Sequence, residues 1–270
     1  MAIASKTISA RNSTPEMFSH PGILLPEPGG YPGLKRGFDF TVALALFVVG
    51  FPIMIVTLLL VKLTSRGPAL YSQIRLGKDG KPFAIYKVRT MYQDAERISG
   101  AAWATPGDSR ITPMGRFLRK THLDELPQLW NVLRGDMSMV GPRPERPEFI
   151  PQLEQAIPYY RARLLVRPGV TGLAQIQLPP DTDFDSVRIK LAYDIHYVKT
   201  MTFVADFKIC WATAFKVVGM HFEKIRAIFG FASGAQIDAE YRNLAGDYQR
   251  KKQTLKEAPK REELTLDAVR

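Results

Sequence analysis

The sequence predicts an α+β, mainly helical protein that lies on one side of a membrane, which is a monotopic arrangement. Three observations support this fold class. An apolar segment at 40–61 carries no charge and contains Pro52, two strand-like runs flank a glycine-rich turn at 77–80, and amphipathic patterns recur beyond residue 112. We therefore expect one Pro-broken re-entrant helix, a small β-hairpin and interfacial amphipathic helices.

The apolar segment at 40–61 has two interpretations. As a helix it reaches about 30 Å, which is enough to cross a bilayer. Pro52, with Gly50 close by, instead predicts a sharp bend near the middle. The positive-inside rule gives no orientation, because basic residues flank both ends: Lys35, Arg36, Lys62 and Arg66. We favour a re-entrant helix that enters and leaves the same leaflet, with both ends in the cytoplasm.

Shorter elements flank or follow this segment. Asp39 is expected either to pair with Arg36, three residues earlier, or to lie among lipid head groups. Runs from Ala69 and Phe83 predict the β-hairpin. Thr112 is expected to cap a short helix that ends near residue 120. Further helices are expected at 127–133, 148–165, 184–197 and 203–231. The last of these fits either a membrane interface or packing on the domain.

Four regions are expected along the chain. Residues 1–33 are rich in Pro, Gly and Ser and predict a mobile arm. The re-entrant helix occupies 34–66 and the main domain 67–231. Residues 232–270 form a charged tail that is helical in part.

Composition and charge narrow the partners. The chain has 270 residues and a formal net charge of +11, which favours nucleic acid, anionic lipid or phosphorylated small molecules. We find no basic, aromatic motif for nucleic-acid recognition, and that function would leave the apolar segment unexplained, so no nucleic-acid partner is expected. Cys210 is the only cysteine, which excludes an intrachain disulfide.

Asp124 and Glu125 are adjacent carboxylates just before Pro127. In the structural interpretation, Thr121 caps a helix and Asp124 closes a capping box three residues later. In the chemical interpretation, Pro127 opens the helix and places both carboxylates at its mouth. The positive end of the helix dipole then lowers a carboxylate pKa and keeps the group ionised, as a nucleophile or metal ligand must be.

Many basic residues surround these carboxylates: Arg116, Arg119, Lys120, Arg134, Arg143 and Arg146. Arg143 lies between two prolines, which restrict its backbone and help to aim its guanidinium. A guanidinium matches phosphate oxygens in a bidentate manner. The alternative is that several of these residues line a solvated face or contact the inner leaflet.

Long motifs in a fixed order identify a family. They are "KRGFDF", the Pro-broken apolar segment, "GPALYSQIRLGKDGKPFAIYKVRTM", "LRKTHLDELPQLWNVLRGDMSMVGPRPE", "VRPGVTGLAQ" and "YDIHYVKTMTFVADFKI". Over about residues 35–219 the chain resembles the bacterial sugar transferases, the monotopic phosphoglycosyl transferases, in their compact catalytic form. The apolar break reads Phe51-Pro52 where relatives often have Ser-Pro. After "TGLAQ" the chain reads "IQLPPDTDF" where many relatives have Asn-Gly-Arg, so sugar or nucleotide contacts there are in doubt.

The resemblance implies a function and a site. It implies that residues 67–231 form a catalytic domain at the cytoplasmic face of the bacterial inner membrane. The catalytic dyad falls on Asp124 and Glu125, and the phosphate-contacting bases fall on Lys87, Arg119 and Arg143. The implied reaction moves a phosphosugar from a nucleoside-diphosphate sugar, usually of uridine, to a polyprenyl phosphate.

The implied mechanism has two steps. Asp124 attacks the β-phosphate and releases a nucleoside monophosphate, and the polyprenyl phosphate then takes the phosphosugar from Asp124. Mg²⁺ is the expected cofactor, with Asp124 as its protein ligand, and Glu125 is expected to orient or deprotonate the acceptor phosphate. A homo-oligomer and downstream glycosyltransferases are further expected partners. The alternative is an inactive, membrane-tethered scaffold for other enzymes of glycan assembly.

Overall fold

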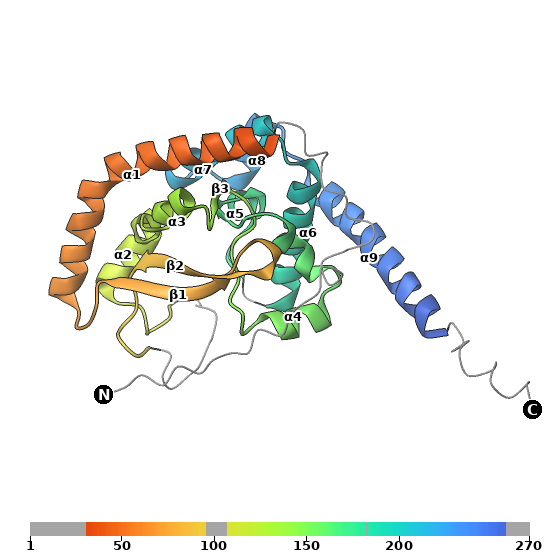
Figure 1. Cartoon of the computed structure of the whole chain (residues 1–270), viewed down its shortest axis with the longest axis horizontal. Coiled ribbons are helices and arrows are strands. Elements are labelled where there is room, and N and C mark those ends of the chain that lie inside the picture. The colour runs from red at the N-terminus through yellow and green to blue at the C-terminus, as the bar shows by residue number, and fades with distance from the viewer. Residues whose placement is uncertain (1–30, 96–106, 182, 258–270) are drawn as a thin grey trace, which may run out of the picture.

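A computed structural model describes residues 31–95, 107–181 and 183–257. The first element is the long helix α1 (Tyr31–Thr64), which contains Pro52. Figure 1 shows that α1 runs along one side of the molecule and then bends sharply. A proline inside a helix removes one backbone hydrogen bond and crowds the preceding turn, which accounts for a bend. Most of the predicted N-terminal arm lies outside the described residues.

The predicted β-hairpin is confirmed. Strand β1 (Leu70–Leu76) pairs with β2 (Pro82–Val88) in antiparallel register, with Tyr71 opposite Lys87. The short turn η2 (Lys78–Gly80) joins the two strands. The sequence patterns did not reveal a second, parallel pair of short strands, β3 (Ser138–Val140) and β4 (Gly169–Thr171).

Helices make up most of the remaining structure. Their bounds are α2 (Pro113–Thr121), η3 (Leu123–Glu125), α3 (Gln128–Arg134), α4 (Ile150–Ala156), η4 (Tyr160–Leu165), α5 (Leu173–Gln177), α6 (Phe184–Thr200), α7 (Phe203–Val217), α8 (Phe222–Phe229) and α9 (Gly234–Glu257). The mainly helical α+β prediction is therefore confirmed for the part of the chain that the structure describes.

Two predicted helices are each divided in the structure. The segment 148–165 forms α4 and η4, because Pro158 lacks a donor N–H and cannot continue an α-helix. The segment 203–231 forms α7 and α8, and Gly219 at φ 88° lies in the break between them. Glycine adopts this left-handed conformation without the steric cost that a side chain brings.

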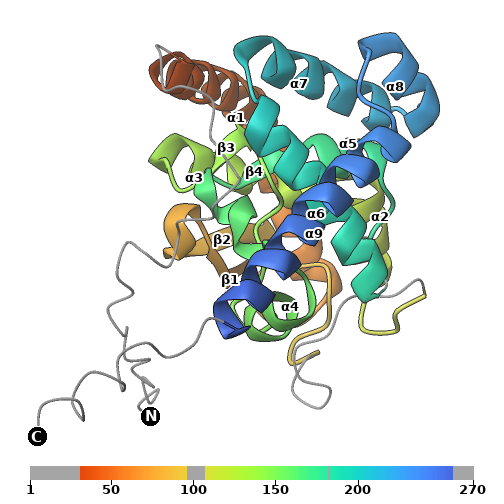
Figure 2. The same ribbon diagram turned by 90° about the vertical axis from the view of Figure 1, so that its right-hand side faces the viewer.

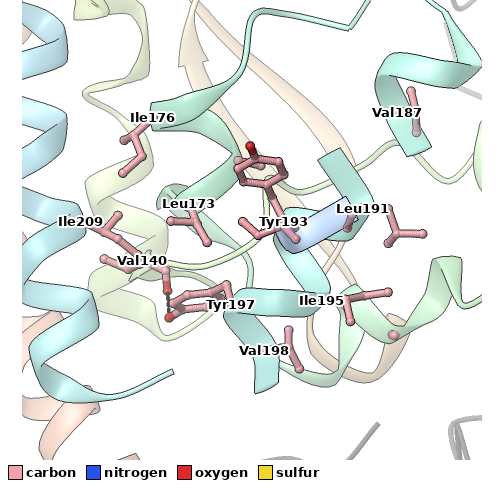
Figure 3. Close-up of a cluster of buried hydrophobic side chains, with 14 of the residues drawn as sticks. Val140, Leu173, Ile176, Val187, Leu191, Tyr193, Ile195, Tyr197, Val198 and Ile209 are labelled. Atoms are coloured by element: carbon pink, nitrogen blue, oxygen red, sulfur yellow. Dashed lines mark hydrogen bonds between the residues drawn. The ribbon is translucent and has the colours of Figure 1, made fainter. Parts of the chain in front are cut away.

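The core lies between the short strands and the helices α5, α6 and α7. Figure 3 shows Val140, Leu173 and Ile209 pointing toward one another from β3, α5 and α7. Tyr197 is also buried there, and its hydroxyl donates to the Val140 carbonyl over 3.1 Å. A buried tyrosine hydroxyl needs such a partner, since leaving it without a hydrogen bond costs stability.

Buried polar contacts fasten the start of α1 to the domain. Lys35 lies 2.6 Å from a carboxylate oxygen of Asp206, which is on α7, and Tyr31 donates to the same oxygen over 2.7 Å. The expected pairing of Asp39 with Arg36 is wrong. Asp39 is buried, accepts a 3.0 Å hydrogen bond from the Met139 N–H, and lies 3.8 Å from the Lys35 ammonium.

Arg36 instead caps α3. Its guanidinium donates to the carbonyls of Val132 (2.6 Å) and Leu133 (2.9 Å), near the C-terminal end of that helix. The last carbonyls of a helix carry the negative end of the helix dipole, so a cation is favoured there.

The other end of α1 contacts the same domain. The Arg89 guanidinium, just after β2, donates to the carbonyls of Arg66 (2.6 Å) and Ser65 (2.9 Å). Val61 of α1 also packs with Val88 and Leu118 in a small apolar cluster. Both flanks of the apolar segment are thus held by the domain that follows it.

Helix α9 packs along α6, as Figure 2 shows. Ile237 and Tyr241 are buried at this contact, and Glu240 pairs with both His196 and Lys199. The predicted charged tail therefore includes a helix whose first turns pack on the domain.

Helices α7 and α8 and the first half of α1 gather on one side of the molecule in both views (Figures 1 and 2). Their exposed side chains include large apolar residues: Leu46, Val49, Phe51, Val204, Phe207, Trp211, Val217 and Ile228. Of the described helices, α1 is the one long and apolar enough to cross a membrane by length and composition. Only 11% of its most apolar stretch is buried in the protein, which is unlike the core helix of a soluble domain.

Candidate active site

The two neighbouring carboxylates lie on a tight turn between two helices. Helix α2 ends at His122, which has φ 57°, and this left-handed residue turns the chain into η3. Asp124 and Glu125 lie on η3, ahead of α3. The capping-box interpretation is wrong, because Thr121 belongs to the last turn of α2 and its hydroxyl donates to the Phe117 carbonyl.

Glu125 is held by two cations. The Lys87 ammonium and the Arg143 guanidinium each lie 2.8 Å from the same oxygen, Oε1 of Glu125. Burial opposes ionisation of this carboxyl, but the charges of Arg143 and Lys87 outweigh it and hold the pKa of Glu125 well below its usual range. The pKa of Glu125 is thus shifted in the predicted direction, but by its two ion pairs and not by the helix dipole.

Asp124 differs from its neighbour. Its side chain is 7% exposed, and its carboxylate has no hydrogen bond or ion pair to any residue that the structure describes. Burial, followed by the negative charge of Glu125, raises the pKa of Asp124, although Lys87, Arg119 and Arg143 act in the opposite direction. The prediction of a lowered pKa at Asp124 is therefore wrong, because burial and the charge of Glu125 outweigh the three cations.

Arg119 approaches the carboxylates from α2. Its Nε donates to the Thr90 hydroxyl over 2.9 Å, and Asp124 is the carboxylate that most favours its charged form. Helix α2 packs closely against the chain just after β2. A Cβ on Gly115 would come within 1.9 Å of the Thr90 carbonyl oxygen. The predicted Thr112 cap is confirmed, with its hydroxyl accepting from the Gly115 N–H over 2.9 Å.

The position of Lys87 is set by β2 and its contact with α3. Asn131 is fully buried on α3, and its side-chain amide donates to the Ala84 carbonyl (2.7 Å) and accepts from the Tyr86 N–H (3.2 Å). A side-chain amide can imitate the edge of a neighbouring strand in this way. These two bonds fix β2 against α3 and bring Lys87 to Glu125.

Arg143 is positioned by groups that the sequence patterns did not single out. Arg163 is buried, and its guanidinium donates to the Arg143 carbonyl over 2.9 Å. The same guanidinium donates to the Tyr160 hydroxyl over 2.8 Å and lies 2.9 Å from a carboxylate oxygen of Asp194. Burial raises the pKa of Asp194 to about 6 despite the cation beside it. Arg163 is 20 positions from Arg143 in the sequence, so no local pattern predicted the contact between them.

The structure thus brings together five predicted site residues: Asp124, Glu125, Lys87, Arg119 and Arg143. Pro52 lies apart from these charges, within α1. The part of α1 around its bend is nevertheless close to the turn that carries the two carboxylates. A Cβ on Gly50 would lie 3.3 Å from a methyl carbon of Leu126. Leu126 directly follows the two carboxylates.

With this geometry in view, comparisons with known proteins identify the family. The sequence model described as "Bacterial sugar transferase" matches residues 31–220. The chain belongs to the bacterial sugar transferase family. This match confirms the resemblance drawn from the motifs, and it covers α1 and every residue of the candidate site.

Relatives in this family include named phosphotransferases. The chain is 43% identical over 192 residues to an Aeromonas hydrophila protein named UDP-N-acetylgalactosamine-undecaprenyl-phosphate N-acetylgalactosaminephosphotransferase, covering 71% of this chain and 45% of that protein. It is 44% identical over 183 residues to a Caulobacter vibrioides UDP-glucose:undecaprenyl-phosphate glucose-1-phosphate transferase, covering 66% and 67%. A protein with the same activity in its name, from Escherichia coli K12, is 40% identical over 185 residues, covering 68% and 40%. The chain spans less than half the length of two of these three relatives.

Proposed function

We propose that this bacterial sugar transferase moves a phosphosugar from a nucleoside-diphosphate sugar to a membrane polyprenyl phosphate. A UDP-sugar is the expected donor, because the three relatives reported above have a UDP-sugar and undecaprenyl phosphate in their names. The reaction is the first membrane step in the assembly of an exopolysaccharide, capsule, O-antigen or glycoprotein glycan. The observation that carries this proposal is the contrast within the dyad: Asp124 has no partner in the described part of the chain, whereas Glu125 is held by two cations.

In the first step, Asp124 is the nucleophile. One of its carboxylate oxygens attacks the β-phosphorus of the donor, forming an aspartyl–phosphorus bond. The bond from this phosphorus to the bridging oxygen breaks, and that oxygen leaves with the α-phosphate as a nucleoside monophosphate. A carboxylate without a protein partner can approach phosphorus without first breaking an ion pair.

In the second step, an oxygen of the polyprenyl phosphate attacks the phosphosugar on Asp124. The aspartyl bond breaks, the carboxylate is regenerated, and the product is a polyprenyl diphosphosugar. Glu125 lies beside Asp124 and its low pKa keeps it ionised, which also makes it a weak base, so we assign it to orienting the acceptor phosphate. Arg119 and Arg143 hold oxygens of the transferred phosphate, and Lys87 keeps Glu125 in place.

The chemistry of the site fits a magnesium ion. No group of three or more metal-ligating side chains occurs among the residues described by the structure. Mg²⁺ is commonly bound by one or two carboxylates together with substrate phosphates, and Asp124 is the available carboxylate. When bound, the ion neutralises charge on the transferred phosphate.

The proposal includes a monotopic arrangement at the cytoplasmic face of the bacterial inner membrane. Both flanks of the apolar segment contact the same domain, through Lys35 to Asp206 and through Arg89 to Ser65. A spanning helix would separate its two ends by the thickness of a bilayer. The exposed apolar side chains of α7 and α8 then lie at the membrane surface beside the first half of α1 (Figure 1).

The function is tested by supplying a panel of UDP-sugars to membranes that contain undecaprenyl phosphate. We expect release of uridine monophosphate with one or a few sugars. With donor alone, the intact protein should gain the mass of one phosphosugar. Nucleotide release that does not depend on the acceptor and yields no lipid product would contradict the transfer. An absence of turnover with every sugar would favour the scaffold alternative.

The topology is tested by thiol labelling in a Cys210→Ser background. With a single new cysteine from Ser13→Cys, an impermeant thiol reagent should label permeabilised cells and leave intact cells unlabelled. Labelling of intact cells would establish a crossing and rule out the re-entrant helix. Pro52→Leu should straighten α1 and expose a fraction of the new cysteines outside the cell. If this substitution changes neither labelling nor activity, the bend has another cause.

A further inference from the structure

A second polar region lies outside the dyad, on α5, α6 and α7. Among the described residues, three buried side-chain atoms on α5 have no hydrogen-bond partner: Oε1 of Gln175 and both amide atoms of Gln177. Gln177 lacks these partners although its side chain is only 2% exposed. Buried polar groups normally have partners, so a concentration of free ones indicates a site that a ligand completes.

This region is next to Arg143. The Thr213 hydroxyl on α7 lies 2.7 Å from the Thr171 hydroxyl on β4, and the Thr171 carbonyl accepts from the Gly141 N–H over 2.9 Å. Gly141 is two residues before Arg143. Lys216 is about one helical turn beyond Thr213 on α7, and it is close enough for the charge of Arg143 to act on it.

The region carries cations that are close enough to affect one another. The Lys216 ammonium donates to the Gln175 carbonyl, and Lys190 lies 2.8 Å from Asp181. Burial lowers the pKa of Lys216, and the charges of Lys190 and Arg143 lower it further. Lys190 lies on the same face of α6 as Asp194, four residues later. Asp194 pairs with Arg163, and Arg163 donates a hydrogen bond to the Arg143 carbonyl. Lys216 therefore lies within the electrostatic reach of both Lys190 and Arg143.

We propose that Lys216 and Lys190 bind the nucleotide half of the donor, and specifically the phosphate that leaves as the nucleoside monophosphate. This inference rests on the proposed function. The donor carries two phosphates, and Arg119 and Arg143 are assigned to the one that is transferred. When the bridging oxygen departs, the other phosphate gains negative charge, and a second set of cations stabilises it.

The test compares Lys216→Gln with Lys208→Gln, which removes one charge from an exposed position on the same helix. Three constants are measured for each protein in nanodiscs: KM for the UDP-sugar, the inhibition constant of uridine monophosphate, and KM for undecaprenyl phosphate. For Lys216→Gln, the first two should rise about tenfold or more, the value of a lost charge-assisted hydrogen bond, and the third should stay within about twofold. Lys208→Gln should leave all three near the wild-type values.

Further variants separate this role from a structural one. Lys190→Gln should also weaken the binding of uridine monophosphate. Lys216→Arg should retain most of the affinity for uridine monophosphate, because arginine keeps the positive charge. A rise in KM for undecaprenyl phosphate alone would assign these cations to the acceptor and overturn the inference. Unchanged constants in a Lys216→Gln protein that transfers sugar normally would also overturn it. A wild-type protein that transfers nothing would instead contradict the proposed function.

Discussion

Two clusters of charged side chains in this protein have similar members but differ in how their carboxylates are paired. One contains Asp39 and Asp206 with Lys35, and it joins α1 to the domain. The other contains Asp124 and Glu125 with Lys87 and Arg143. In the first, both oxygens of Asp206 accept hydrogen bonds, from Tyr31 and Lys35 on one side and from Tyr197 on the other. In the second, Asp124 has no partner among the described residues.

The difference indicates how the two clusters are used. A carboxylate whose hydrogen bonds are all made inside the protein stabilises one arrangement of the chain, and removing a partner leaves a buried charge unpaired. A carboxylate beside cations that are already engaged remains free to react. We therefore assign structure to the Asp206 cluster and chemistry to the Asp124 cluster, and four substitutions or conditions test this assignment.

Asp124→Asn should have the largest effect. The change is nearly isosteric but removes the nucleophile, so we expect turnover to fall by roughly a thousandfold or more. The protein should remain folded and membrane-bound, because no hydrogen bond to Asp124 is lost. Uridine monophosphate release and a thermal unfolding curve provide the two measurements. Turnover near the wild-type rate would remove Asp124 from the nucleophile role.

Asp206→Asn should affect stability instead. It leaves the Lys35 ammonium without its closest anion, and we expect a loss of about 3 kcal/mol in the free energy of unfolding. Denaturant unfolding in detergent measures this loss, and turnover per folded molecule should stay close to that of the wild type. A large fall in turnover with unchanged stability would reverse the assignment of the two clusters.

Arg143→Lys should lower turnover by more than tenfold. Lysine keeps the charge but loses the planar fork that matches phosphate oxygens, and the flanking prolines limit any compensating movement. Steady-state rates at saturating donor and acceptor measure the effect. Arg134→Lys, at a more exposed position, is a suitable control and should change little. Equal activity of Arg143→Lys and the wild type would make Arg143 a structural or surface residue.

The pH dependence should show the smallest effect. Burial and the charge of Glu125 raise the pKa of Asp124, so its carboxylate is protonated at a higher pH than an ordinary aspartate. As pH falls through this raised pKa, Asp124 takes up a proton and kcat/KM for the donor should decline. The decline should begin at a pH higher than the usual aspartate pKa of about 3.9. Glu125→Gln should reduce turnover and also move the remaining acid limb to lower pH, because it removes a neighbouring negative charge. An acid limb that moves upward would contradict this electrostatic account.

Local sequence determined much of this protein. Pro52 inside a charge-free apolar run predicts a bent helix, and Thr112 followed by Pro113 predicts the start of α2, because both depend on backbone geometry near one residue. The alternating runs around 77–80 predict the hairpin for the same reason. The ordered motifs also identified the family, which the match over residues 31–220 confirms.

Only the tertiary structure decided which charged groups meet. Lys87 reaches Glu125 across 38 positions, Arg163 holds the carbonyl of Arg143, and Lys35 pairs with Asp206 across 171 positions. The ionisation of Asp124 and Glu125 depends on these contacts, because burial and neighbouring charge act through space. Two carboxylates that are adjacent in the sequence therefore have pKa values shifted in opposite directions, and no local pattern can separate them.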